Sequence, residues 1–140
     1  MTREIKFKGK SKRDGRWWFG NLCVKGTKGN TQIYDPEYGG CFEIDSDTVG
    51  QFTGLHDKNG KEIYEGDILC IRQHELNILR GAFRETEIIC VVEFRNGAFI
   101  PVMSNGIGYH WSNFIYGVTP TKDYTVIGNI YDNPELLKDS

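Results

Sequence analysis

The chain has 140 residues, 39% of them hydrophobic and 26% charged, which is typical of one globular domain and excludes a largely disordered segment. No stretch approaches the roughly 20 apolar residues that a membrane helix needs, and the charged opening residues 1–6 lack the apolar region of a signal peptide. We therefore expect a cytoplasmic protein without membrane contact. In that reducing compartment the four cysteines should be thiols; they are Cys23, Cys41, Cys70 and Cys90.

Charge is distributed unevenly along the chain. Residues 1–28 carry nine lysines and arginines against two carboxylates, a net charge of +7, so the remainder carries −9 to reach the total of −2. A basic front and an acidic body in one chain favour contacts between copies. We therefore expect a homo-oligomer, with a protein or nucleic-acid partner as a further possibility.

Apolar residues alternate with polar ones over most of the first half, a pattern typical of half-buried strands. In residues 5–8, Ile5 and Phe7 should share one face. Asp14-Gly15 is predicted to form a two-residue turn, with Lys12 and Arg13 at its tip in solvent, and Asn59-Gly60 a type I′ turn. The predicted strands cover residues 5–8, 16–24, 31–34, 41–44, 49–55 and 61–64.

The second half contains the most apolar strand, residues 68–71, which we expect to be buried on both faces. The pattern predicts a hairpin of residues 86–94 and 98–102 around Asn96-Gly97. Residues 74–83 fit either a long hairpin loop or a short helix. Residues 104–119 should form a long packed loop, 123–131 a strand, and 134–137 one helical turn capped by Asn133.

Three stretches, 49–55 (VGQFTGL), 57–68 (DKNGKEIYEGDI) and 126–137 (VIGNIYDNPELL), together with the opening 3–7 (REIKF), closely resemble the YopX family of phages and prophage regions. The resemblance implies a mainly β fold with minor helix: an N-terminal β-hairpin subdomain (1–48) and an antiparallel, SH3-like small barrel (49–140). It supplies no activity, substrate or catalytic residue. The motif residues to which we assign structural roles are Gly54, Asp57, Asn59, Gly60, Tyr64, Gly66, Asp67, Gly128 and Asn129.

Metal binding and catalysis find little support. Carboxylates at 57, 62, 65 and 67 could gather a divalent cation, but their spacing is not that of a calcium loop, and a turn in which Asp67 accepts a backbone hydrogen bond is favoured. The cysteines and the three histidines (His56, His74, His110) show no paired zinc spacing, so buried core cysteines are favoured. A cysteine–histidine pair could form on folding, but no local pattern indicates one, and serine-elbow, phosphate-loop and dinucleotide motifs are absent. We expect no enzyme activity, cofactor or metal.

The basic hairpin followed by Trp17-Trp18-Phe19 is the strongest functional signal, because cations neutralise phosphates and an exposed aromatic ring stacks on bases. Alternation directs Trp17 and Phe19 into the core and leaves Trp18 outside. The candidate nucleic-acid residues are Lys6, Lys8, Lys10, Lys12, Arg13, Arg16 and Trp18. A solvated hairpin or an oligomer contact explains the same basic run and is favoured.

These observations predict a non-enzymatic phage or prophage accessory protein that acts by docking and self-association. The alternative is a nucleic-acid-binding module that uses the basic hairpin.

Overall fold

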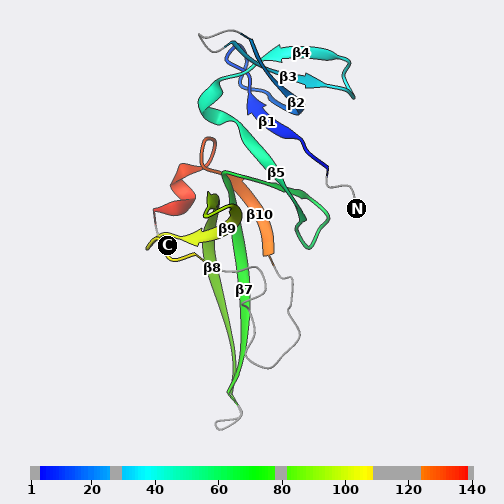
Figure 1. The fold of residues 1–140 in the computed structure, drawn as a ribbon. Coiled ribbons are helices and arrows are strands. Elements are labelled where there is room, and N and C mark those ends of the chain that lie inside the picture. Colours follow the sequence, from blue (N-terminus) through cyan, green and yellow to red (C-terminus); the bar gives the residue numbers. More distant parts are fainter. Residues whose placement is uncertain (1–3, 26–29, 78–81, 109–123, 139–140) are drawn as a thin grey trace. The chain divides into compact units, whose positions relative to one another are not determined.

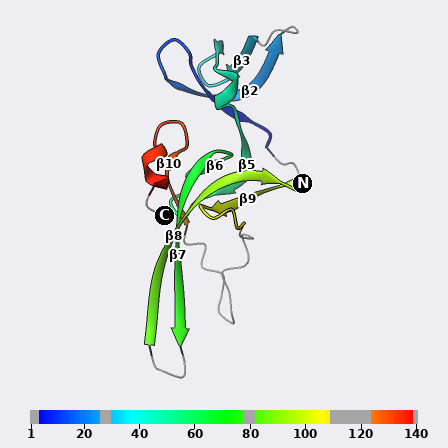
Figure 2. The same cartoon turned by 90° about the vertical axis from the view of Figure 1, so that its left-hand side faces the viewer.

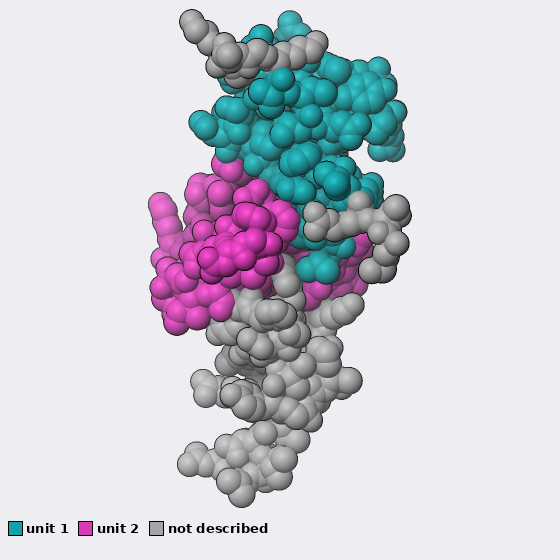
Figure 3. Space-filling view, viewed as in Figure 1, with its two compact units in different colours: residues 1–55 teal, residues 56–140 magenta. Residues whose placement is uncertain are grey.

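A computed structural model describes residues 4–25, 30–77, 82–108 and 124–138, with backbone alone at residues 25, 73–77 and 82–86 (Figure 1). The chain divides into two compact units, residues 1–55 and 56–140 (Figure 3). The sequence places this division after residue 48, and the structure places it after Leu55.

The chain is mainly β, as predicted. One antiparallel sheet has the strand order β4-β3-β2-β1-β5-β6. The 3-10 helix η1 (Ser46–Thr48) precedes β5. The strands are β1 (Phe7–Lys10), β2 (Trp17–Lys25), β3 (Asn30–Asp35), β4 (Gly40–Glu43), β5 (Gly50–His56) and β6 (Glu62–Tyr64).

The core of the N-terminal unit lies on one side of β1–β4. Trp18, Ile33 and Ile44 are buried, and four partly buried side chains pack against them. Residues paired directly across antiparallel strands share a face, and the register pairs Leu22 with Ile33 and Ile33 with Phe42. The four surrounding side chains are Phe7, Leu22, Phe42 and Val49.

The sheet curls around this core. Beyond the end of β4, Ile44 forms an isolated bridge to Ser11 beyond the end of β1, and the Asp45 N–H donates to the Lys10 carbonyl (2.9 Å). Gly9 makes the close approach possible, because a Cβ atom there would overlap the Ile44 side chain. Gly9 is paired with Trp18, so it also leaves room for the indole.

The predicted faces of β2 are wrong. Trp18 is 6% exposed and Phe19 is 41% exposed, the reverse of the expectation from alternation. Alternation within the strand holds, but the pairing of Trp18 with Gly9 and of Leu22 with Ile33 selects the even-numbered face for the core. Ile5 was expected to share a face with Phe7 in a half-buried strand, yet it precedes β1 and is 60% exposed.

The C-terminal unit holds a four-stranded antiparallel sheet in the order β10-β7-β8-β9. Its strands are β7 (Asp67–Asn77), β8 (Ala82–Arg95), β9 (Ala98–Met103) and β10 (Tyr124–Asn129), and the 3-10 helix η2 (Pro134–Leu137) follows. The central strand 68–71 is confirmed, since Ile68, Leu69 and Ile71 are almost fully buried. Among the described residues the sheet stays open, with β10 and β9 at its edges, and does not form the predicted closed SH3-like barrel.

Residues 74–83 form neither of the predicted structures in their described part. Residues 74–77 continue β7 and 82–83 begin β8, with register pairs from Arg72–Glu87 to Asn77–Ala82. The β10 ladder reaches only Ile71 on β7, and the β9 ladder only Cys90 on β8. In the described chain the outer parts of β7 and β8 therefore form a two-stranded ribbon (Figures 1 and 2), because cross-strand pairing overrides the weak apolar pattern of this segment.

The turn at Asn96-Gly97 is confirmed, since both residues have positive φ angles (51° and 81°), as a type I′ turn requires. The same prediction for Asn59-Gly60 is wrong, because of the two only Gly60 has a positive φ (83°). The Gly60 N–H donates to the Asp57 carbonyl (3.0 Å), which indicates a type I turn followed by a left-handed glycine.

The predicted two-residue turn at Asp14-Gly15 is also wrong. The Ser11 N–H donates to the Arg16 carbonyl (2.8 Å), and the Gly15 N–H donates to the Ser11 carbonyl (3.0 Å), so the loop spans residues 12–15. Lys12 and Arg13 are exposed there, as predicted.

At the C-terminus the single helical turn is confirmed. Asn133 occupies the N-cap position, as predicted, but its side chain makes no capping hydrogen bond and instead accepts one from the Asn129 N–H (3.3 Å). The predicted loop 104–119 lies mostly outside the described residues. No helix in the described part of the chain has the length and apolarity to cross a membrane.

Candidate functional site

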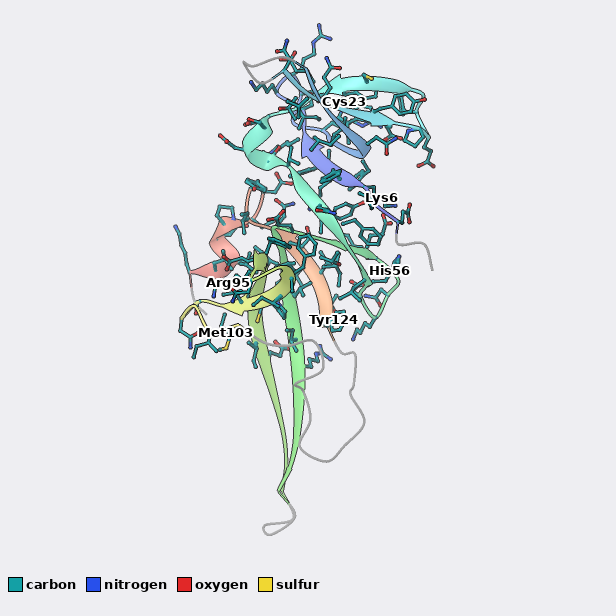
Figure 4. All side chains as sticks on the ribbon, in the orientation of Figure 1. Lys6, Cys23, His56, Arg95, Met103 and Tyr124 are labelled. Atoms are coloured by element: carbon teal, nitrogen blue, oxygen red, sulfur yellow. The ribbon has the colours of Figure 1, made fainter. Side chains whose placement is uncertain are left out.

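The side of the N-terminal sheet opposite the core is the candidate site, and we call it the outer face. Register pairs Lys8 with Phe19 and Lys10 with Trp17 on this side, and Asn21, Tyr34 and Cys41 form a further row. The outer face comprises Lys8, Lys10, Trp17, Phe19, Asn21, Cys23, Gln32, Tyr34, Cys41 and Glu43. Figure 4 labels Cys23 on β2 of this unit.

Aromatic side chains give the outer face its character. Phe19 is 41% and Tyr34 38% exposed, and Trp17 is half-buried beneath the Lys8 ammonium, whose Nζ lies 4.8 Å from the indole centroid. The solvent side of an antiparallel sheet is ordinarily polar. The exposed rings make this face the candidate interaction surface.

Trp18 belongs to an aromatic cluster on the core side. Its ring stacks on Phe42 (centroids 3.6 Å apart, planes 2° apart), and Tyr38 meets both rings edge-on. The Arg16 guanidinium lies 4.4 Å from the indole centroid, and because Phe42 occupies one face, this cation covers the other. Neither face of Trp18 can therefore receive a base in this arrangement.

The seven residues predicted for nucleic acid do not share one surface. Trp18 is buried and Arg16 lies over it, whereas Lys8 and Lys10 lie on the outer face. Lys12 and Arg13 are exposed in the loop. The Lys6 Nζ contacts the Glu4 carboxylate (3.3 Å) and lies 5.3 Å from the Phe52 centroid; Figure 4 labels Lys6 near β1.

A pocket of about 580 Å³ opens between the β1–β2 loop and β4. Asp14 stabilises the loop wall, since its Oδ1 accepts a hydrogen bond from the Arg16 N–H (3.0 Å). This bond, more than the Arg16 charge, holds the pKa of Asp14 below its ordinary value. The lining residues are Ser11, Lys12, Arg13, Asp14, Trp18, Cys41, Phe42 and Glu43.

The first motif carboxylate, Asp57, ties a turn to the sheet of the C-terminal unit. Its Oδ1 accepts the N–H groups of Asn59 and Lys61 (both 2.9 Å), and its Oδ2 accepts the Val126 N–H of β10 (3.0 Å). Burial raises the pKa of this carboxyl, but the hydrogen bonds and the Lys61 charge outweigh burial, so the pKa lies below its ordinary value.

The remaining motif residues shape turns. The Asp67 carboxylate accepts the Tyr64 N–H (2.8 Å), and Gly66 donates to the Val92 carbonyl and accepts from the Ile130 N–H. The Asn129 side chain accepts two further N–H groups of the chain reversal after β10. These bonds support the turn interpretation of the acidic motif, and the described residues hold no group of three or more potential metal ligands among histidine, cysteine, aspartate and glutamate.

The four cysteines are free thiols, but the expectation that all are buried is wrong. Cys90 is buried, and burial together with nearby Cys70 raises its pKa to about 11. Cys41 is exposed because it lies on the outer face, and Cys23 and Cys70 are half-buried. His56 is exposed; the His74 side chain and all of His110 lie outside the described part.

The fold and site define an all-β protein with two antiparallel sheets and, in its described residues, no α-helix. The family model described as "YopX protein" matches residues 6–138. The chain belongs to the YopX family, which confirms the prediction from its motifs.

Among solved structures, the chain is similar to the crystal structure of protein EF1440 from Enterococcus faecalis. The two share 24% sequence identity and a TM-score of 0.50, over 98% of this chain and 100% of the other. At this level of sequence identity the similarity shows a shared fold. No curated protein matches the sequence.

Proposed function

We propose that this YopX-family chain is a non-enzymatic phage or prophage accessory protein that acts by docking, and that the outer face binds a second copy of the chain. The observation that carries the proposal is the exposure of Phe19 and Tyr34 on a sheet face whose opposite side already packs the core. Aromatic residues are enriched at protein interfaces.

Charge supports a second copy as the partner. Residues 4–25, which contain β1 and β2, carry seven lysines and arginines against two carboxylates, a net charge of +5. Residues 30–48, which contain β3 and β4, carry five carboxylates and no lysine or arginine, a net charge of −5. The β1–β2 part of the unit is thus basic and its β3–β4 part acidic, and on the outer face itself Lys8 and Lys10 lie at one end and Glu43 at the other.

Such a face is complementary to itself. A two-fold axis parallel to the strands, between two stacked outer faces, would oppose β1–β2 of one copy to β3–β4 of the other. Every contact in such an interface occurs twice. The charges then steer and orient the association, while the aromatic residues supply its affinity.

Sedimentation of wild type and of the double variant Phe19→Thr/Tyr34→Thr tests the proposal. Wild type should sediment as a dimer. The variant should dissociate at least ~100-fold more readily, since truncated aromatic hot spots each cost about 2 kcal/mol or more, and threonine retains the strand propensity.

The matched control is Phe94→Thr, because Phe94 is an exposed aromatic residue on β8 of the C-terminal unit. It should leave the dimer intact. A wild-type monomer at about 1 mM, or equal dissociation of the control, would refute self-association through this face.

A nucleic-acid module is a second candidate function, in which Phe19 and Tyr34 take the place of Trp18 beside three of the predicted cations. Exposed Phe19 and Tyr34 share the outer face with Lys10, and Lys12 and Arg13 are exposed in the adjoining loop. Rings beside cations are the arrangement that binds single strands without sequence preference.

Titration of labelled single- and double-stranded DNA tests this candidate. With three phosphate contacts, single-strand affinity should fall about 20-fold between about 50 and 200 mM salt. Lys12→Glu/Arg13→Glu should weaken binding, whereas Lys138→Glu in the C-terminal unit should not. Affinity that ignores salt, or no binding at low salt, would exclude this function.

A further inference from the structure

Four residues of the outer face lie on one diagonal of the N-terminal sheet, one on each of the strands β1–β4. Each step along the diagonal is offset by two residues from the direct register pair, always in the same direction along the strands. Residues related in this way share a face and lie about 7–8 Å apart. In order, the four are Lys10 on β1, Phe19 on β2, Tyr34 on β3 and Glu43 on β4.

The chemistry of the diagonal is symmetric about its centre. The two central residues are the exposed rings, and the two ends carry opposite charges, a lysine and a glutamate. Glu43 is exposed and Lys10 half-buried, whereas Lys8, the other cation of the outer face, is only 5% exposed. Rings at the centre and charges at the ends are the usual arrangement of a protein interface, whose rim is polar.

The curl of the sheet limits how two outer faces can meet. Because the sheet curls around its core, the outer face is convex, and two convex faces touch along a band. A two-fold axis parallel to the strands keeps each residue at its own height along them, so Lys10 of one copy would lie far from Glu43 of the other. A two-fold axis perpendicular to the diagonal instead reverses the order of the diagonal between the copies.

We infer that two copies meet along this diagonal, an inference that rests on the self-association through the outer face proposed above. The two-fold axis is perpendicular to the diagonal and therefore inclined to the strands. Lys10 of each copy opposes Glu43 of the other, and Phe19 opposes Tyr34, so that each contact occurs twice. The four rings supply the affinity, and the two ion pairs select this orientation over all others.

Charge exchange between the ends of the diagonal tests the orientation by sedimentation equilibrium on the full chain. Lys10→Glu opposes two glutamates at both ends of its own dimer, and Glu43→Lys opposes two lysines. Each variant alone should dissociate at least ~10-fold more readily than wild type, because like charges placed opposite each other are repulsive.

An equal mixture of the two variants gives the decisive result. In the mixed dimer both ends again join a glutamate to a lysine, so the mixture should associate to within ~3-fold of wild type. The double variant Lys10→Glu/Glu43→Lys should also recover, because the charges are exchanged within one chain. Misfolding cannot produce either gain.

The matched control is a mixture of Lys12→Glu and Glu37→Lys, which make the same changes of charge at exposed positions off the diagonal. This mixture should be no tighter than its two components. An equal gain in the control would assign the effect to net charge and overturn the orientation.

The remaining outcomes separate this inference from the proposal beneath it. A wild-type dimer whose charge variants do not recover on mixing would overturn the diagonal and leave self-association through the outer face in place. A wild type that stays monomeric at about 1 mM would refute both.

Discussion

Trp18→Ala should lower the free energy of unfolding of the N-terminal unit by about 3–5 kcal/mol, the usual cost of truncating a buried tryptophan. The indole is 6% exposed, packs with Ile33 and Ile44, and lies between Phe42 and the Arg16 guanidinium. Its removal leaves a cavity that the curled sheet cannot close. Urea unfolding, followed by circular dichroism and by NMR signals of β2 and β3, measures the loss.

The matched control is Phe19→Ala, one residue along the same strand. Phe19 is 41% exposed on the outer face, so its truncation should cost about 1 kcal/mol or less. The alternation in the sequence alone predicts the opposite order of effects. A larger loss for Phe19→Ala than for Trp18→Ala would show that the assignment of the two faces is inverted.

Asp57→Asn should destabilise the C-terminal unit by about 2–4 kcal/mol near neutral pH. The carboxylate accepts three backbone N–H groups through both oxygens. An amide has one acceptor oxygen, so its NH₂ group would face a backbone donor at one of these positions. Urea unfolding of wild type and variant measures the difference.

The pH dependence of Asp57→Asn follows from the direction of the pKa shift. The pKa of Asp57 is lowered on folding, so its stabilisation is complete above the unfolded pKa of about 3.9 and disappears as the pH falls through the folded value. The stability gap between wild type and variant should therefore be constant above about pH 5 and narrow below about pH 4.

Asp132→Asn is the control for this titration. Asp132 is exposed in the chain reversal after β10, where its carboxylate accepts from the Asn129 side chain (3.2 Å). Its replacement should cost about 1 kcal/mol or less. If the stability difference between wild type and Asp57→Asn does not narrow below about pH 4, the charge of the Asp57 carboxylate contributes nothing to folding.

Local chemistry was sufficient to predict most strands and several turns. Strand 68–71, the Asn96-Gly97 turn and the Asp67 hydrogen bond all depend on residues close together in the chain. The terminal 3-10 turn likewise follows from Pro134. The type I′ turn predicted at Asn59-Gly60 does not form, and the Asp57 carboxylate accepts the Asn59 N–H there. The Asn133 side chain makes no capping bond because it accepts the Asn129 N–H instead.

The candidate site was predicted only in part. The basic loop with Lys12 and Arg13 was placed correctly in solvent, because charged residues around a turn remain hydrated whatever the fold. The exposed pair Phe19 and Tyr34 was missed, since neither residue differs in sequence pattern from a buried strand aromatic. The pocket between the β1–β2 loop and β4 was also missed, because its two walls come together only in the folded sheet.

The sequence by itself determined the family, the β class and the positions of the main strands, since these depend on motifs and on period-two alternation. The tertiary structure decided which side of each strand is buried. Alternation defines two faces but does not say which one meets the core; that choice was made by the pairing of Trp18 with Gly9 and of Leu22 with Ile33. A shift of one residue in that register would exchange core and surface along β2, and with them the rings that stabilise the unit and the rings available to a partner.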